Sequence, residues 1–386
     1  MIEPFRIHVP QAVLDDLGDR LSRTRWTDDF ANDDWVYGAN TAYISDLAEY
    51  WRHGYDWRAR EALMNTLPQF RTLIDGLPIH FVHVRGKGPH PTPILLSHGW
   101  PWTFWDFHKI IGPLTDPAAY GGDPADAFDV VAPSLPGFGF STPLTTPGVN
   151  WWKTADLWVS LMDRLGYARF GAHGGDVGAF ISAQLGHKYA DRLVGVHLTT
   201  PGMLTFMTGG GWAPADYAPD EAPFVARMMH TRATEIGHFV LQSTKPQNLA
   251  VALGDSPAGL LAWLVDKRRN WSDSGGNVET RFSKDDLLDN AMLYWATGSY
   301  HTSARFYYEG AHWPWRPSHD RSPVVEAPTA IAVFPAELTF APREQAKRYY
   351  NLNRWTLMPA GGHFAAMEEP AALVDDLRAF FRESRA

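Results

Sequence analysis

The five residues Gly174-Gly175-Asp176-Val177-Gly178 follow a short apolar run at 167–172 and lead directly into a helical run at 179–189. A strand that turns sharply into a helix needs small residues two positions before and two positions after its tip, because strand and helix nearly touch there. The usual tip is serine, but here it is Asp176, placed above the sheet near a helix N-terminus that favours its ionised form. The plainer interpretation is an acidic residue in an ordinary glycine turn, and these five residues alone do not separate the two.

Short apolar runs that stop at Gly- or Pro-rich turns recur on both sides of this stretch. Two of them precede it and, after a long break, two more follow it, at 93–97, 128–132, 330–334 and 354–358. Segments of helical length separate most of these runs. This alternation is typical of β–α–β units, so we predict an α/β fold with a mostly parallel central sheet flanked by helices.

The long break has a different pattern from the runs around it. Helical periodicity dominates there, as at 256–269, after a loose glycine-rich loop at 208–211. A helical block is therefore expected to be inserted between two parts of one α/β core. The expected division is an N-terminal extension at 1–90, a first part of the core at 91–200, a helical cap at 201–322 and a second part of the core at 323–386.

Two residue types that complete a catalytic triad follow Asp176 in the chain. Glu337 comes just after the run at 330–334, and His363 comes just after the run at 354–358. The order nucleophile, acid, histidine is that of the α/β-hydrolase fold, and the carboxyl ends of parallel strands are where such sheets place their catalysts. Glu337 alone could be a helix-capping acid and His363 a loop histidine, but the three in this order, each at a strand end, favour a triad.

An early turn agrees with the triad. His98-Gly99-Trp100-Pro101 follows the run at 93–97, where this fold supplies one N–H of its oxyanion hole. The second N–H comes from the residue after the nucleophile, which assigns the backbone amides of Trp100 and Val177. A tight turn with a tryptophan in the core is the alternative.

Composition narrows the function classes. Asp and Glu outnumber Lys and Arg by 43 to 34, which lacks the basic footprint of a nucleic-acid binder, and the chain has no cysteine. No apolar run approaches the roughly 20 residues of a membrane helix, and the first residues do not resemble a signal peptide. We therefore expect a cytoplasmic protein without nucleic-acid or membrane partners, in which 13% aromatic residues permit an aromatic-lined pocket.

Taken together, these motifs resemble the microsomal-type epoxide hydrolases, including their soluble bacterial members, over almost the whole chain. The extension carries typical stretches at 4–7, 55–58 and 70–81, and the cap carries others at 255–259 and 305–309. Arginine far outnumbers lysine, which is closest to the actinomycete members that act in the biosynthesis of enediyne antibiotics. The resemblance implies that the partner is a small-molecule epoxide, which the tryptophan content suggests is apolar or aromatic. A homodimer is compatible with the sequence.

The resemblance also implies a mechanism without metal or cofactor. Asp176 would attack a ring carbon and form an alkyl ester, while Tyr307 of the cap would protonate the leaving oxygen. His363, oriented by Glu337, would then activate water to hydrolyse the ester and release a vicinal diol.

One position departs from the family pattern. Relatives carry a second cap tyrosine in a Glu-x-x-Tyr-x-x-x-Gln stretch, whereas residues 235–242 place His238 there. An imidazolium could donate the same hydrogen bond, but near neutral pH it is only partly protonated. The alternatives are that Tyr307 acts alone, that Tyr308 or Tyr300 substitutes, or that His238 only shapes the pocket.

Two rival functions remain. Haloalkane dehalogenases use the same triad logic but place tryptophan after the nucleophile, where this chain has Val177. A non-catalytic ligand-binding protein of the same fold would be expected to lose a triad member, and none of the three is missing. A serine esterase is disfavoured because acyl transfer to Asp176 would give an anhydride.

Overall fold

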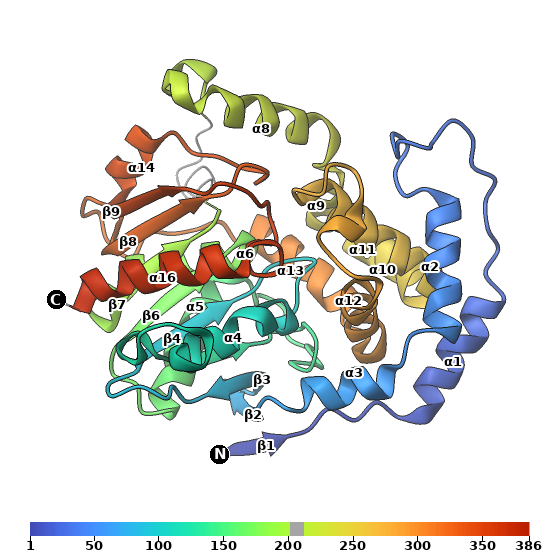
Figure 1. Ribbon diagram of the computed structural model, residues 1–386, viewed down its shortest axis with the longest axis horizontal. Helices are drawn as coiled ribbons and strands as arrows, with labels where there is room; N and C mark the ends of the chain where they lie inside the picture. The colour runs from blue at the N-terminus through green and yellow to red at the C-terminus, as the bar shows by residue number, and fades with distance from the viewer. Residues whose placement is uncertain (201–211, 386) are drawn as a thin grey trace.

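The computed structural model of the protein describes residues 1–200 and 212–385 (Figure 1). Within them, one nine-stranded sheet has the order β1-β2-β3-β5-β4-β6-β7-β8-β9. The strands from β5 to β9 in that order run parallel, and β1, β2, β3 and β5 pair antiparallel. The strands are β1 (Ile2–Phe5), β2 (Gln69–Ile74), β3 (Leu77–Val84), β4 (Thr92–Ser97), β5 (Phe128–Pro133), β6 (Phe170–Gly174), β7 (Leu193–Leu198), β8 (Val325–Val333) and β9 (Tyr350–Leu357).

The helices that surround this sheet come from every part of the chain. They are α1 (Gln11–Ser22), α2 (Thr41–His53), α3 (Trp57–Met64), α4 (His108–Thr115), α5 (Trp151–Arg164), α6 (Asp176–Lys188), α8 (Ala222–Thr234), α9 (Gly237–Thr244), α10 (Pro246–Asp255), α11 (Pro257–Trp271), α12 (Lys284–Thr297), α13 (Tyr300–His312), α14 (Arg343–Tyr349), α15 (Ala365–Glu368) and α16 (Pro370–Arg385). The mostly parallel sheet flanked by helices confirms the predicted fold class. The glycine-rich loop expected at 208–211 lies outside the described residues.

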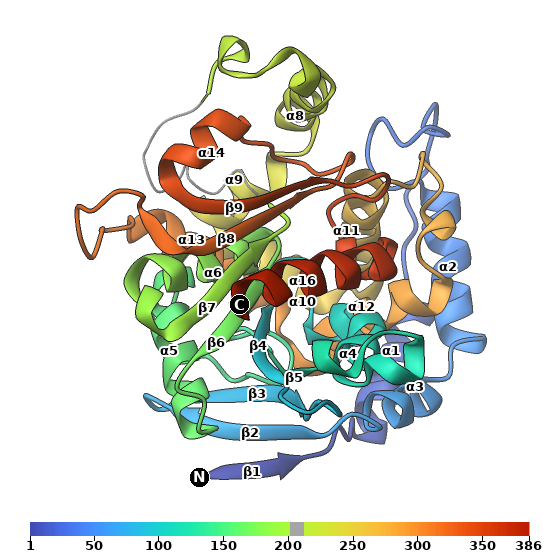
Figure 2. The ribbon, with the colours of Figure 1, turned by 60° about the vertical axis from the view of Figure 1, so that its left-hand side comes forward.

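Helices cover both faces of the central strands (Figure 2). Gly195 of β7 lies against Phe380 of α16, whereas the next residue, Val196, lies against Gly186 of α6. Successive side chains of a strand point to opposite faces, so α16 and α6 are on opposite sides of the sheet. Helix α4 packs on α16, and α5 packs on α6. Burial on both faces explains why β4 and β5 are mainly apolar and do not alternate between apolar and polar residues.

The strand ends are in register at one edge of the sheet. Ser97 at the end of β4 pairs with Gly174 of β6, which in turn pairs with Leu198 of β7. Beyond β8 and β9, a further bridge joins Ala336 to Gly362. The loops that follow these strands therefore start side by side, which is the arrangement that the site requires.

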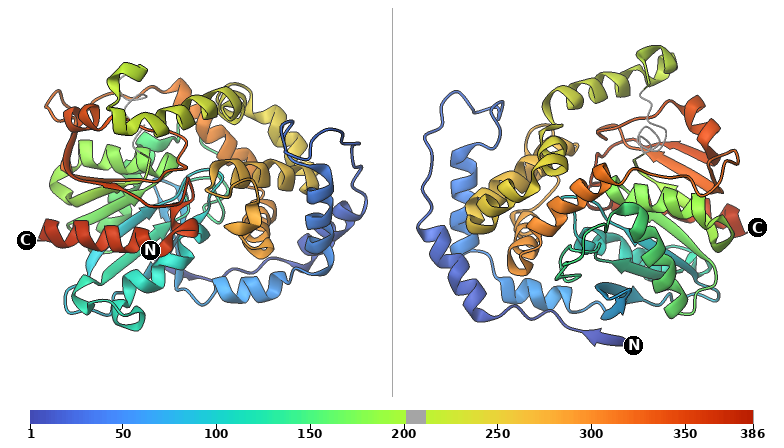
Figure 3. Two further views of the ribbon diagram at one scale, coloured as in Figure 1. Left: turned by 45° about the horizontal axis from the view of Figure 1, so that its top comes forward. Right: turned by 180° about the vertical axis from the view of Figure 1, so that it is seen from behind.

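The helices α8 to α13 stand between β7 and β8 in the chain and lie beside the carboxyl edge of the sheet (Figure 1). Helices α1 and α2 pack on α11 of this group, so the N-terminal segment reaches around to the inserted helices (Figure 3). Asp289 of α12 joins the inserted helices to the N-terminal segment and to the loop after β4. It accepts a hydrogen bond from the Tyr55 hydroxyl at 2.8 Å, pairs with Arg60, and accepts from the Trp105 indole at 3.0 Å.

Across the described ranges, no individual helix has both the length and the apolar content to cross a membrane. The pair α10 and α11 meets those criteria only when its two helices are taken together, and they are bent by 117°.

Candidate active site

The sharp turn between β6 and α6 holds Asp176 in a left-handed backbone conformation, with φ of 49°. A Cβ added to Gly178 would overlap the Ser97 carbonyl group, and one added to Gly174 would overlap the backbone of Gly178. Strand and helix are thus as close as the sequence predicts, and only glycine fits on either side of the tip. The helix begins at Asp176 itself, earlier than the run at 179–189 suggested.

The Asp176 carboxylate is bound by backbone amides. The Trp100 N–H donates to Oδ1 of the carboxylate at 2.8 Å. The backbone of Asp176 is held separately, because its own N–H donates to the Thr200 hydroxyl at 2.9 Å. Burial works to raise the pKa of Asp176. The hydrogen bond and charge of His363, followed by the amides of Trp100 and Val177, outweigh burial and lower that pKa below its ordinary value. The site therefore holds an ionised carboxylate.

Glu337 and His363 meet Asp176 from the ends of β8 and β9. The His363 Nδ1 lies 2.9 Å from Glu337 Oε1, and its Nε2 lies 3.4 Å from Asp176 Oδ2. The Leu338 N–H donates to Glu337 Oε1 at 2.6 Å, and the Thr200 hydroxyl donates to Oε2 at 3.3 Å. The three predicted triad residues are thus brought together, with the imidazole between two carboxylates.

The charge state of His363 follows from that arrangement. Burial opposes a charged imidazole, but the charges and hydrogen bonds of Glu337 and Asp176 outweigh it and raise the pKa of His363 to about 10. The ring is therefore a charged imidazolium, with a proton on each nitrogen, at neutral pH as long as Asp176 is ionised and not esterified. Because part of this shift comes from Asp176, the pKa of His363 depends on whether Asp176 keeps its charge.

Tyr307 of α13 is buried, close enough to Asp176 for the charge of the carboxylate to act on its hydroxyl. Its ring meets the Trp100 ring edge-on, at 5.9 Å and 85°. Burial, followed by the negative charge of Asp176, holds the pKa of Tyr307 well above its ordinary value, so the hydroxyl keeps its proton. The neighbouring Tyr308 is partly exposed and stacks on His312, while the Tyr300 hydroxyl donates to Gln242 at 3.3 Å.

His238 stacks flat on the Trp100 ring, with centroids 5.3 Å apart. Its Nδ1 lies 2.8 Å from the Glu235 carbonyl oxygen, and because a carbonyl only accepts, Nδ1 carries the proton. Burial lowers the pKa of His238 to about 3, so the ring is neutral and Nε2 is an acceptor. At this position burial outweighs the Glu235 carbonyl and the charge of Asp176, so the structure gives no support to the alternative in which His238 is an imidazolium donor.

Sequence reasoning missed two residues of this site. Thr200 joins the nucleophile to the triad acid, and the Trp271 carbonyl accepts the His363 backbone N–H at 2.9 Å. Thr200 follows β7, whose residues 193–198 lack a clear strand pattern because Gly195 and His197 interrupt the apolar positions. Trp271 is the last residue of α11, and no local signal connects it with a histidine 92 positions later. In the part of the chain that the structure describes, no group of three or more His, Cys, Asp or Glu side chains could hold a metal ion.

Comparisons with known proteins identify the family and the fold of this chain. Residues 2–107 match the family model described as epoxide hydrolase N terminus, and residues 92–370 match the α/β-hydrolase fold. A protein of Stigmatella aurantiaca (strain DW4/3-1) named "Putative epoxide hydrolase" is 43% identical over 386 residues, covering 100% of this chain and 86% of the relative. Epoxide hydrolase 1 of Oryctolagus cuniculus is 36% identical, covering 98% of this chain and 88% of the relative. The crystal structure of juvenile hormone epoxide hydrolase from Bombyx mori superposes with a TM-score of 0.87 at 30% identity, covering 100% of this chain and 95% of that chain.

Proposed function

This chain belongs to the epoxide hydrolases of the α/β-hydrolase fold, and from that membership we propose that it converts a small-molecule epoxide to a vicinal diol through an ester of Asp176. One observation carries the proposal: the elbow that holds serine in esterases holds an ionised aspartate, bound by a backbone amide and facing a histidine–glutamate pair. A carboxylate is a competent nucleophile toward the sp³ carbon of an epoxide.

In the first half-reaction, an Asp176 oxygen attacks a ring carbon and the carbon–oxygen bond of the epoxide breaks. Oδ1 accepts the Trp100 N–H, so Oδ2 is the oxygen that attacks. Tyr307 gives its proton to the departing alkoxide. The raised pKa of Tyr307 means that the proton stays on the hydroxyl until a strongly basic alkoxide forms.

In the second half-reaction, His363 becomes a base. Ester formation removes the Asp176 charge that helped to raise the pKa of His363, so the imidazolium gives up its proton more readily. That proton restores the Tyr307 hydroxyl, which lost its own proton to the alkoxide, and the neutral imidazole then takes a proton from water. The hydroxide attacks the ester carbonyl, whose oxygen Oδ1 stays on the Trp100 amide, with the Val177 amide as the second donor. The products are the diol, ionised Asp176 and protonated His363.

The cap assignment and the substrate class belong to the same proposal. We assign 1–90 to the N-terminal extension, 201–322 to the cap, and 91–200 and 323–386 to the core. The rings of Trp100, Trp271, His238 and Tyr307 lie against one another beside the triad, which supports an apolar or aromatic epoxide. A cytoplasmic location, a homodimer and a role in antibiotic biosynthesis stay predictions from the sequence.

The test is a single-turnover experiment on His363→Gln with styrene oxide, followed by intact-protein mass and peptide mapping. We expect the mass of one substrate molecule to be added to the peptide that contains Asp176, because alkylation proceeds and hydrolysis does not. Asp176→Asn is the control and should form no adduct. If wild type produces no diol from a panel of epoxides, or releases halide from haloalkanes instead, the proposal is wrong.

A further inference from the structure

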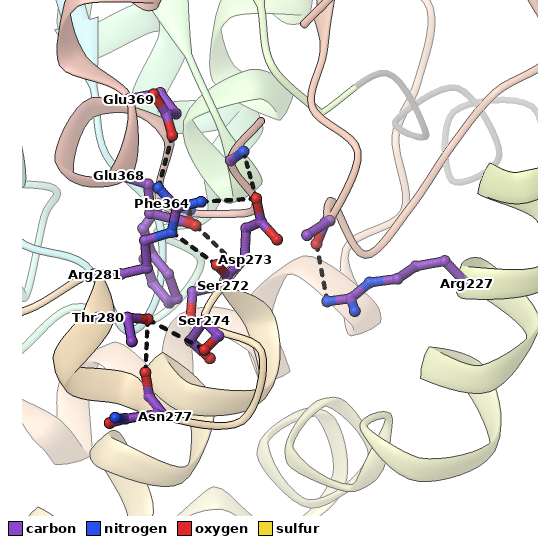
Figure 4. Close-up of polar contacts among 12 residues, drawn as sticks. Arg227, Ser272, Asp273, Ser274, Asn277, Thr280, Arg281, Phe364, Glu368 and Glu369 are labelled. Carbon is purple, nitrogen blue, oxygen red and sulfur yellow. Dashed lines mark hydrogen bonds and ion pairs between the residues drawn. The ribbon is translucent and has the colours of Figure 1, made fainter. Parts of the chain in front are cut away.

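A second group of polar side chains lies next to the histidine loop in the sequence, between the segment after α11 and the loop after β9 (Figure 4). We name Asp273, Arg281 and Glu368 the histidine clasp. Glu368 is buried on α15, five positions after His363. Its Oε1 accepts the Phe364 N–H at 2.8 Å, and its Oε2 accepts the Asp273 N–H of the cap at 2.7 Å. One carboxylate therefore ties the histidine loop to the cap.

The other members of the clasp bind the same loop from the cap side. Asp273 Oδ2 accepts the Gly361 N–H at 3.0 Å and an Arg281 Nη2 hydrogen at 2.8 Å. Arg281 also donates to the Asp273 carbonyl oxygen at 2.7 Å and pairs with Glu369 at 2.7 Å. The cap thus holds the loop on both sides of the catalytic ring.

The backbone of the loop is in direct contact with the cap. The N–H groups of Gly361 and His363 end on cap oxygens, at Asp273 and Trp271. A Cβ on Gly362 would lie 2.9 Å from the Trp271 carbonyl oxygen and 3.0 Å from the Asp273 nitrogen, which leaves no room for a side chain. The position of the imidazole is therefore set by the end of α11 and the segment that follows it.

Retaining a buried carboxylate at position 368 is energetically costly. Burial raises the pKa of Glu368 to about 7, despite the two N–H donors and the positive charge of Arg281. An apolar side chain would fill the same space without that cost. What only a carboxylate supplies is two acceptors at once, one for each side of the contact between loop and cap.

We propose that Glu368, acting through the histidine clasp, is a positioning residue that places His363 for attack of water on the Asp176 ester. The inference rests on the proposed function. Alkylation uses Asp176, Trp100 and Tyr307, none of which the clasp contacts, so the clasp serves the second half-reaction selectively. A small displacement of a catalytic group costs on the order of 100-fold in rate.

The test separates the two half-reactions in Glu368→Gln, which keeps the size of the side chain but loses one acceptor. Wild type and variant are mixed with styrene oxide, quenched over a time series and analysed by intact mass. We expect alkylation within about twofold of wild type and ester hydrolysis slowed by about 10- to 100-fold, so that the ester accumulates. Asp273→Asn, whose side chain is 38% exposed, tests the same contact if Glu368→Gln does not fold.

The matched control is Glu344→Gln, the same change in an exposed ion pair with Lys347 on α14, which should leave both rates unchanged. A merely structural role for Glu368 would slow both half-reactions together or leave both unchanged in folded protein, and either result overturns the inference. If His363→Gln forms no ester with any epoxide, the proposed function itself fails, and the failure is then visible without any clasp variant.

Discussion

At the scale of single residues, the chemistry of the site depends on two protons, one on the Tyr307 hydroxyl and one on the His363 ring, and the pKa of each depends on the charge of Asp176. Tyr307 keeps its hydroxyl proton because burial and the Asp176 charge both disfavour a phenolate. His363 holds its second proton through the charges and hydrogen bonds of Glu337 and Asp176, and holds it less tightly once Asp176 loses its charge. The same aspartate therefore controls the acid of the first step and the base of the second.

Removing the Tyr307 hydroxyl should mainly slow alkylation. The rings of Tyr300 and Tyr308 have other partners, and the neutral His238 offers no proton from Nε2. We expect Tyr307→Phe to lower the alkylation rate by about 100-fold or more, the usual contribution of a general acid. Rapid-quench measurement of ester formation in the His363→Gln background checks this. Near-wild-type alkylation would mean that another group supplies the proton.

Changing His238 to tyrosine should add a second hydroxyl donor beside Tyr307, because the neutral imidazole offers no proton from Nε2. The His238 ring lies flat on Trp100 and beside the Tyr307 ring. A tyrosine ring in its place would put a second hydroxyl on the side of the pocket where Tyr307 lies. We expect His238→Tyr to raise the alkylation rate severalfold and to leave ester hydrolysis unchanged. The control is His238→Phe, which has the ring without the donor and should not accelerate alkylation. Equal rates in the two variants would show that the position does not reach the epoxide oxygen.

At the scale of elements, the elbow between β6 and α6 is the part with least freedom. Helix α6 crosses the end of β4 so closely that the Gly178 Cα faces the Ser97 carbonyl group without space for a methyl group. Strands β4 and β6 lie in the middle of the sheet and each pairs with a neighbour on both sides, so neither strand can shift alone. The close contact fixes the nucleophile above the sheet.

Gly178→Ala is therefore expected to be strongly destabilising. The added methyl group would overlap backbone atoms, and overpacking of this kind costs about 1–3 kcal/mol or more. The control is Gly18→Ala on α1, where no atom lies within 4 Å of the added Cβ and the helix should gain up to about 1 kcal/mol. Urea unfolding of both variants, with the midpoint and slope compared with wild type, measures the difference. Similar stability in the two variants would contradict the assigned packing.

The elements that sequence could predict are those whose signal is local. The runs at 93–97 and 128–132 are strands buried on both faces, so both are mainly apolar, with Asp129 the charged exception. The sequence does not predict strand β2 because that strand is partly exposed, and it does not predict β7 because a glycine and a histidine interrupt the apolar pattern. In the site, Asp176, Glu337 and His363 were found because each follows its own strand. Thr200 and the clasp depend on pairing between distant segments, which no local pattern records.

At the scale of the whole molecule, stability depends on several buried histidines that must stay neutral. His98 donates from Nδ1 to the Gly99 carbonyl at 2.9 Å, and its Nε2 accepts the Leu135 N–H at 3.0 Å, so no nitrogen is left for a second proton. Burial lowers the pKa of His98 to about 4 and that of His80 to about 3. The pKa of His363 is shifted in the opposite direction, to about 10. Its protonated form stabilises the fold at neutral pH, and this stabilisation is lost as pH rises through about 10.

These shifts predict a fall in stability as the solution is acidified from pH 7 to pH 5. The unfolded chain binds protons on histidine below about pH 6.5, whereas the folded chain does not bind them on His80 or His98 until about pH 4 or lower, so acid favours unfolding. Each such histidine contributes a loss of about 2 kcal/mol over that range. Glu368 works in the opposite direction, because its pKa near 7 lets the folded state bind a proton first.

The measurement is the free energy of unfolding in urea at pH 7 and pH 5 for wild type, His80→Gln and His301→Gln. His80 is fully buried between Ser134 and Gln69, each 2.9 Å from a ring nitrogen, whereas His301 is exposed on α13. Glutamine at position 80 carries no titratable group, so the loss of stability between the two pH values should shrink by about 2 kcal/mol in that variant and stay at the wild-type value in the control. If His80→Gln loses as much stability as wild type, protons enter the folded core at pH 5, and the neutral state assigned to His80 is wrong.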